Sequence, residues 1–158
     1  INNVISSYSK YEKKSKKDQI LVQSQTKDVV YSGVIFSRNI QNNGPYYFIN
    51  FDKSSSTNSV TGGKVGDKLE IIKNIQLENL DPPWKSIVES IKEIEGSLHN
   101  LTLDCEFAIN KSGKVVIFQV RPFAANQKFK TLPDKKVFCT IQQLIQQYNR
   151  LAKAMAFR

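Results

Sequence analysis

Histidine and cysteine are scarce in this sequence. There is one histidine, His99, and there are two cysteines, Cys105 and Cys139. No set of them has the spacing of zinc ligands, so a structural zinc site is not expected and any metal must be held by oxygen ligands. Two cysteines far apart, outside any C-x-x-C pattern, make a poor disulfide framework, which favours a reducing cytoplasm.

The sequence also lacks a long apolar run. No stretch approaches the roughly 18 apolar residues of a membrane span, and no secretion signal follows Ile1. Hydrophobic residues make up 40% and charged residues 23% of 158 residues, which is ordinary for one globular domain. We therefore expect a cytoplasmic chain, without membrane insertion, that is a piece of a longer protein.

Acidic residues are few. There are 14 of them against 23 basic residues, which gives a formal net charge of +9. Such an excess favours a polyanionic ligand, which could be a nucleotide, a nucleic acid or an anionic membrane surface. Much of it lies in Tyr8–Lys17, a run that a solvated helix end and loop would also explain. Charge alone does not choose among these ligands.

The order of apolar segments and turn formers predicts an α+β fold with an antiparallel sheet packed against helices. A strand meander is expected first, then a loop of Ser, Thr, Asn and Gly over Lys53–Gly66. Prolines after Asp81 and apolar residues at helical spacing predict a helix up to Leu98. The remaining elements are a truncated helix at Asn2–Tyr11, strands at Gln19–Gln25, Tyr31–Arg38, Tyr46–Asp52 and Lys68–Ile75, a hairpin of Thr102–Ile109 with Lys114–Arg121, and an amphipathic helix at Thr140–Ala156.

The hairpin has the turn sequence Asn-Lys-Ser-Gly at 110–113. A loop of two or four residues sets Ile109 opposite Lys114, Glu106 opposite Ile117 and Asp104 opposite Gln119, whereas three residues would scramble the two faces. With an even loop, one face is apolar and carries Leu103, Cys105, Phe107, Val116, Phe118 and Val120. The other face carries Asp104, Glu106, Gln119 and Arg121, together with Ala108 and Ile117.

An ordinary hairpin with one buried and one wet face would show the same alternation. The residue types favour more than that. Glu106 and Gln119 offer hard oxygens to Mg²⁺, and Arg121 can bind phosphate through two parallel hydrogen bonds. Pro122 ends the strand where Arg121 should project. The set suits triphosphate chemistry.

Three segments resemble one family. Leu103-Asp-Cys-Glu-Phe-Ala-Ile109 followed by Val116-Ile-Phe-Gln-Val-Arg-Pro122 is similar to the D-x-E-[FW]-A … [IL]-x-Q-x-R-P signature of the nucleotide-binding domain of pyruvate phosphate dikinase and phosphoenolpyruvate synthase. Ile20-Leu-Val-Gln23 and Ser32-Gly-Val-Ile-Phe-Ser-Arg-Asn39 resemble that family's V-L-V-Q and S-G-V-x-F-[ST]-R-[DN] strands, in the same order.

The resemblance implies the C-terminal subdomain of an ATP-grasp fold over 1–125. The resemblance does not extend to 126–158, which we expect to be a helical extension packed on that subdomain. It implies that ATP and Mg²⁺ bind, with Glu106 and Gln119 on the metal. Arg121 would contact the phosphates as the catalytic cation, and Asp104 would lie behind it. The nucleotide would also be contacted by Arg38 and by the backbone of Gln23, Ser24 and Gln25 beside adenine.

The family's activity implies phosphoryl transfer from ATP to a histidine and then to pyruvate or a similar acceptor. The first ATP-grasp subdomain and the phosphohistidine domain would be further parts of the parent protein, so the fragment alone should be inactive. His99 is expected at the surface, without a catalytic role. Where the family has a glycine-rich G-L-G-E stretch, this chain has Ile49–Asp52 and then a Ser/Thr/Gly loop. That loop either holds phosphate through its amides or is a surface connection.

Two other functions fit parts of the sequence. A nucleic-acid-binding module would use the positive charge and the strand aromatics Tyr31, Phe36, Tyr46 and Tyr47. No recognition helix or RNA-binding aromatic motif accompanies them. A non-catalytic interaction domain on the same scaffold is the other alternative, and the intact Glu106, Gln119 and Arg121 argue against it.

Overall fold

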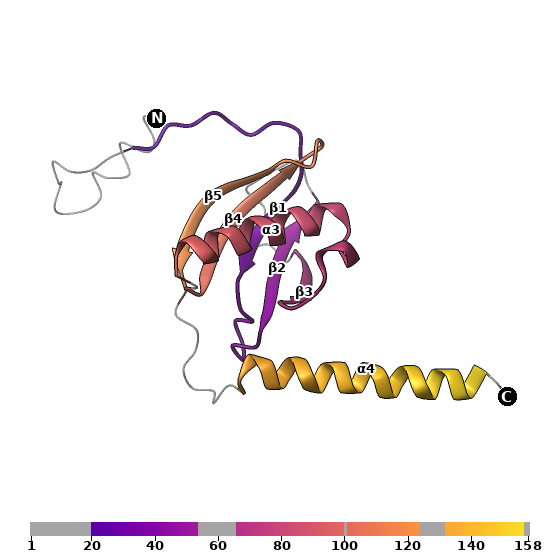
Figure 1. Cartoon of the computed structure of the whole chain (residues 1–158). Helices are drawn as coiled ribbons and strands as arrows, with labels where there is room; N and C mark the ends of the chain where they lie inside the picture. Colours follow the sequence, from indigo (N-terminus) through magenta and orange to yellow (C-terminus); the bar gives the residue numbers. More distant parts are fainter. Residues whose placement is uncertain (1–19, 54–65, 100, 124–131, 157–158) are drawn as a thin grey trace.

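The computed structural model of the protein describes residues 20–53, 66–99, 101–123 and 132–156. They form a five-stranded antiparallel sheet with a helix across one face and a second helix at one end of the sheet (Figure 1), which confirms the expected α+β class. The strand order is β3-β2-β1-β4-β5. The strands are β1 Val29–Phe36, β2 Tyr46–Asp52, β3 Asp67–Ile72, β4 Leu103–Asn110 and β5 Val115–Pro122; the helices are η1 Leu77–Asn79, α3 Pro82–Ser97 and α4 Asp134–Ala156.

The helix α3 covers one face of the sheet, which we call the covered face. The helix starts at Pro82, where the missing N–H of proline costs no hydrogen bond. Ile87, Val88 and Ile91 on its inner side are fully buried. Trp84 packs against Phe51, with ring centroids 4.5 Å apart. The sheet contributes the alternate residues of each strand to this core, among them Ile35, Tyr47, Ile49, Phe51, Ile71, Leu103, Cys105, Phe107 and Ile109.

Gly33 lets β1 and β2 approach each other within the sheet. A Cβ built on Gly33 would lie 2.2 Å from the carbonyl oxygen of Asn50 and 2.8 Å from the Cα of Phe51. Backbone atoms cannot give way as a side chain can, so only glycine fits this position. Gly33, in the predicted strand Tyr31–Arg38, therefore has a packing role.

The prediction of a strand at Gln19–Gln25 is wrong for the part described. Residues 20–27 belong to no strand or helix. Leu21 and Val22 are 80% and 71% exposed. β1, the next strand along the chain, is bonded on both sides, to β2 and β4, so it cannot pair with the segment that precedes it. The predicted helix at 2–11 lies outside the described residues, as does all of the predicted loop except Lys53 and Gly66.

The hairpin register differs from the prediction at two places, the turn and a bulge. Each shifts the pairing by one residue, so beyond the bulge the side chains return to the predicted faces. The turn leaves Ile109 opposite Val115, which shifts the register by one residue. Two features stabilise this three-residue turn, which Asn110 and Lys114 close. Gly113 has φ +79°, and the Asn110 side chain accepts hydrogen bonds from the backbone N–H of Ser112 and of Lys114. A bulge then leaves Phe118 without a partner and shifts the register once more.

The bulge restores the predicted segregation where the polar residues lie. Glu106 is opposite Gln119, and Asp104 is opposite Arg121. Between the turn and the bulge the prediction fails, since Ile117 and not Val116 faces the core.

The helix α4 begins earlier than predicted and projects away from the sheet (Figure 1). Its first turns contact the domain, through Asp134 and through Ile141. Beyond Ile141 all described residues of the helix are exposed. The expected packing of 126–158 on the domain is thus seen only where α4 begins, because its later apolar residues extend past the edge of the sheet. In the described part of the chain, no helix combines the length and hydropathy needed to cross a membrane.

Candidate functional site

The polar face of the hairpin forms the candidate site. It belongs to the sheet face opposite α3, which we call the second face. Glu106 on β4 is directly opposite Gln119 on β5, and Asp104 is opposite Arg121. Directly opposed residues have Cβ atoms about 5 Å apart, so each pair can reach one ligand atom together. The register therefore brings together the four hairpin residues that the sequence singled out.

Asp104 and Arg121 form an ion pair in which one oxygen of the Asp104 carboxylate has no partner. The Arg121 guanidinium donates to Oδ2 of Asp104 at 2.8 Å. The other oxygen, Oδ1, is buried and has no hydrogen-bond partner. A buried carboxylate oxygen without a donor is costly, so this atom is set up to accept from a ligand, a water or a cation. Arg121 itself is half exposed, at 52%, and can still reach outward.

Glu106 and Gln119 are free to bind. Within the described residues neither side chain makes a hydrogen bond or an ion pair. A carboxylate and an amide oxygen are hard ligands of the kind that Mg²⁺ takes, usually with waters and substrate phosphates completing its shell. No cluster of three or more His, Cys, Asp or Glu side chains able to hold a metal occurs in that part of the chain. A metal here would thus depend on the nucleotide for further ligands.

Asn50 on β2 belongs to the same line of residues and was not predicted. It pairs with Val34, which in turn pairs with Glu106, so one row crosses the second face from β2 to Gln119. The Oδ1 atom of Asn50 is buried and has no hydrogen-bond partner. The signal in the sequence was a polar residue at alternate positions, Asn50 and Asp52, in an otherwise apolar strand.

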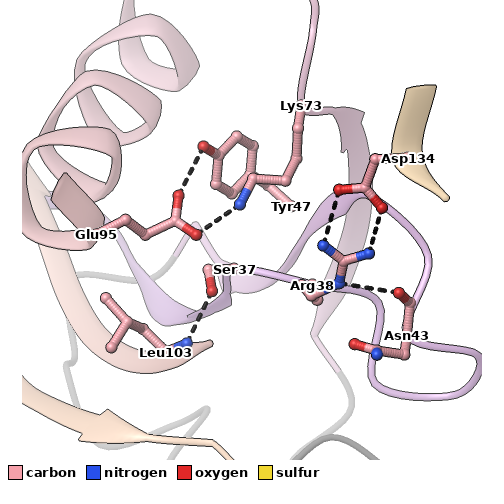
Figure 2. Close-up of polar contacts among 8 residues, drawn as sticks. All are labelled: Ser37, Arg38, Asn43, Tyr47, Lys73, Glu95, Leu103 and Asp134. Carbon is pink, nitrogen blue, oxygen red and sulfur yellow. Dashed lines mark hydrogen bonds and ion pairs between the residues drawn. The ribbon is translucent and has the colours of Figure 1, made fainter. Parts of the chain in front are cut away.

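Arg38 forms no hydrogen bond or ion pair with the hairpin residues and binds Asp134 and Asn43 instead (Figure 2). Its guanidinium donates to both carboxylate oxygens of Asp134, at 2.9 and 2.6 Å, and its Nε donates to the carbonyl of Asn43. This hydrogen bonding to Asp134 raises the pKa of Arg38 and lowers the pKa of Asp134. In this arrangement Arg38 anchors the start of α4.

The three residues expected beside adenine lie in the segment before β1. Gln23, Ser24 and Gln25 are all exposed and outside any strand. They lead to the end of β1 that pairs with Asn110, whereas Asp104 pairs near the other end of β1, at Phe36. The described fold does not bring them together with the hairpin group.

A second polar cluster, which we call the Glu95 cluster, lies on the covered face (Figure 2). Glu95 of α3 accepts hydrogen bonds from Tyr47 Oη at 3.0 Å and from Lys73 Nζ at 2.5 Å. Lys73 Nζ also lies 4.9 Å from the centroid of the Tyr47 ring. Burial and the nearby Glu95 carboxylate raise the pKa of Tyr47 above its usual range. The cluster joins β2, the end of β3 and α3.

The two cysteines and the histidine lie outside both polar clusters. The Cys105 thiol is buried in the core, and burial raises its pKa to about 11, so it is a poor nucleophile. Cys139 is also a free thiol. His99 is exposed after the end of α3, with φ +55°, as expected for a surface residue.

Comparison with known proteins does not assign this geometry to a family. No protein-family model, no curated protein and no solved structure matches the chain. The functional argument therefore depends on the residues of the second face.

Proposed function

We propose that this chain is the C-terminal half of an ATP-grasp nucleotide-binding domain in a phosphotransferase of the pyruvate phosphate dikinase and phosphoenolpyruvate synthase type. One observation carries the proposal. The register sets Glu106 against Gln119 and Asp104 against Arg121 on one face of the sheet. Their spare oxygens and the half-exposed guanidinium match the needs of a metal-bound triphosphate.

Each residue then has a distinct role. Glu106 and Gln119 would hold Mg²⁺, which supplies charge neutralisation between phosphate oxygens when it is bound. Arg121 contacts the phosphates and offsets negative charge that develops on transfer. Asp104 orients Arg121 through the 2.8 Å hydrogen bond. A role for Arg38 at the nucleotide requires it to release Asp134 first.

The proposal also says what lies outside this chain. The first ATP-grasp subdomain would cover the second face and supply further basic contacts to the phosphates. A separate domain would carry the histidine that accepts the phosphoryl group and passes it to pyruvate or a similar acceptor. Gln23–Gln25 would meet adenine between the two subdomains, which fits their exposure here. On this proposal the 158-residue chain alone does not turn over ATP.

The test is calorimetric titration of Mg-ATP into a form of the protein that contains both subdomains. We expect binding that requires Mg²⁺ and is weakened at least about tenfold by Glu106→Ala and by Arg121→Ala, the loss of one charged contact each. Glu78→Ala removes an exposed carboxylate of η1, away from the second face, and serves as the matched control.

The same variants separate the alternatives. In the parent protein, phosphorylation of the histidine of the separate acceptor domain should be lost in Glu106→Ala while the fold persists. Retained phosphorylation in that variant would refute the metal assignment. Absence of Mg-ATP binding by folded wild-type protein would instead favour a scaffold that has lost its chemistry.

A further inference from the structure

Asn50 carries a side-chain oxygen on the second face that the fold leaves unpaired. Its Oδ1 atom is buried and accepts no hydrogen bond from the described residues. Directly opposite Asn50 are Val34 on β1, which has no side-chain donor, and Lys68 on β3, which is exposed and does not donate to this oxygen. A buried acceptor without a donor is costly, and an apolar residue here would avoid the cost. The packing of β2 therefore does not explain the amide.

The Asn50 amide is within reach of a ligand on the second face. The residue as a whole is partly exposed, although its Oδ1 atom is not. The bond that carries the amide group of an asparagine has broad rotational preferences, so the oxygen can turn outward at small cost. A ligand that offers the missing hydrogen bond would favour that rotation.

The metal and the phosphates of a bound nucleotide do not supply the missing partner. Asn50 and Glu106 lie on the two strands that flank β1, about 10 Å apart, with Val34 between them. A metal held by Glu106 and Gln119 lies on the far side of Val34, toward β5. Phosphate oxygens at neutral pH accept hydrogen bonds and do not donate them. The donors that a nucleotide does have are its ribose hydroxyls and the amino group of adenine.

The position of Asn50 favours the ribose over the base. Arg121 lies level with the end of β1, and Gln23–Gln25 precede the start of that strand. Asn50 is opposite Val34, between these two levels. A nucleotide with its phosphates at Arg121 and its base at Gln23–Gln25 has its ribose between them. An amide group and a hydroxyl can each donate and accept, so the two match in either orientation.

We propose that Asn50 binds a ribose hydroxyl of the nucleotide and makes the site prefer ribonucleotides to deoxyribonucleotides. This inference rests on the nucleotide-binding function proposed above. It gives the site a selectivity that Glu106, Gln119 and Arg121 do not supply, because metal and phosphates are the same in ATP and in its deoxy analogues. A site built to hydrogen-bond a hydroxyl rejects an analogue that lacks it, since a buried polar group then stays unpaired.

The test is calorimetric titration of the protein that contains both subdomains with the Mg²⁺ complexes of ATP, 2′-deoxy-ATP and 3′-deoxy-ATP. We expect the wild type to bind ATP about tenfold more tightly than at least one of the deoxy analogues, the loss of one hydrogen bond to a buried acceptor. This comparison needs no substitution, so it does not depend on how a variant folds. Equal affinities for all three nucleotides would overturn the inference.

Asn50→Ala tests whether this residue is responsible for the preference. The variant should bind ATP about tenfold more weakly than the wild type does. It should bind the disfavoured deoxy analogue at least as tightly as the wild type, so that the preference disappears. Asn74→Ala, which removes an exposed amide in the turn after β3, is the matched control and should keep the preference. A preference that survives in Asn50→Ala would overturn the assignment.

Urea unfolding of the 158-residue chain tests whether the amide is structural instead. Asn50→Ala should leave the urea midpoint close to that of the wild type, because the buried oxygen has no hydrogen bond to lose. A clearly lower midpoint would overturn the binding role.

The outcomes also separate this inference from the function on which it rests. Absence of Mg-ATP binding by the folded wild type, or binding that Glu106→Ala leaves unchanged, would overturn the nucleotide site and the role of Asn50 together. Binding that depends on Glu106 but shows no preference for the ribose hydroxyls would overturn the role of Asn50 alone.

Discussion

The two polar clusters of this protein differ in how completely they are paired. In the Glu95 cluster on the covered face, both carboxylate oxygens of Glu95 have partners within 3.0 Å. On the second face, Glu106 and Gln119 bind nothing among the described residues, and Asp104 and Asn50 each keep a buried oxygen without a donor. Both clusters contain charged residues, but only in the Glu95 cluster do the carboxylate oxygens all have hydrogen-bond partners within the cluster.

This difference separates a structural role from a binding role. Buried polar groups in folded proteins are almost always hydrogen-bonded, so a paired cluster needs no further explanation than the elements it joins. Buried oxygens without a donor on one face of the sheet have a cost that a ligand would remove. The comparison predicts that the two clusters respond oppositely to substitution: stability changes in one and ligand binding in the other.

The largest expected effect is on the Glu95 cluster. Glu95→Ala should lower the free energy of unfolding by about 3 kcal/mol, the low end for a broken buried ion pair, because Lys73 remains partly exposed. Urea unfolding followed by the fluorescence of Trp84, the only tryptophan, measures this. Glu95→Gln keeps an acceptor for Tyr47 and should cost less. Equal stability of wild type and Glu95→Ala would show that the cluster is not structural.

A smaller loss is expected for Tyr47→Phe. Removing a hydrogen bond to a charged group should cost about 1.5 kcal/mol in the same urea experiment. The folded state raises the pKa of Tyr47, so it holds the proton more tightly than the unfolded chain does. That contribution is complete below about pH 10 and is lost as the pH rises further. The gap between wild type and Tyr47→Phe should therefore narrow above pH 10, and a gap that widens would contradict the assigned protonation.

Asp134 should contribute less. Its side chain is 39% exposed, and exposed ion pairs stabilise by under about 1 kcal/mol. The folded state lowers the pKa of Asp134, so its contribution is present above the unfolded pKa of about 3.9 and is lost as the pH falls through the folded value. The unfolding free energies of wild type and Asp134→Asn should thus differ near neutral pH and converge in acid. A constant difference down to acidic pH would exclude this linkage.

The smallest stability change is expected on the second face, at Glu106. Glu106→Ala should alter the unfolding free energy by less than about 0.5 kcal/mol, because the side chain makes no hydrogen bond or ion pair with the described residues that the substitution would break. The same variant should lose Mg²⁺-dependent nucleotide binding in the two-subdomain protein. Substantial destabilisation would mean that Glu106 belongs with the paired cluster instead.

Much of the fold follows from local signals in the sequence. The β2 bounds Tyr46–Asp52 agree with the prediction, and α3 follows its prolines and its apolar spacing. The grouping of Asp104, Glu106, Gln119 and Arg121 on one face was also predicted correctly. These features depend on periodicity and turn residues, which are properties of short segments.

The failures concern partners that no short segment encodes. Leu21 and Val22 were predicted to lie in a strand, yet they are exposed and pair with none of the described strands. The opposition of Asp104 to Arg121 could not be foreseen, because it depends on a bulge at Phe118 that the apolar run conceals. The Glu95 cluster was missed for the same reason, since Tyr47, Lys73 and Glu95 come from three elements brought together only by the tertiary fold.

The bulge at Phe118 makes the position of the site residues depend on the length of the turn. The three-residue turn and the bulge each shift the register by one, and only their sum returns Gln119 and Arg121 to the side of Glu106. A deletion in the turn alone would move both side chains into the core, and so would loss of the bulge alone. Both changes together would restore the site, so in descendants of this sequence turn length and strand length can change only as a pair.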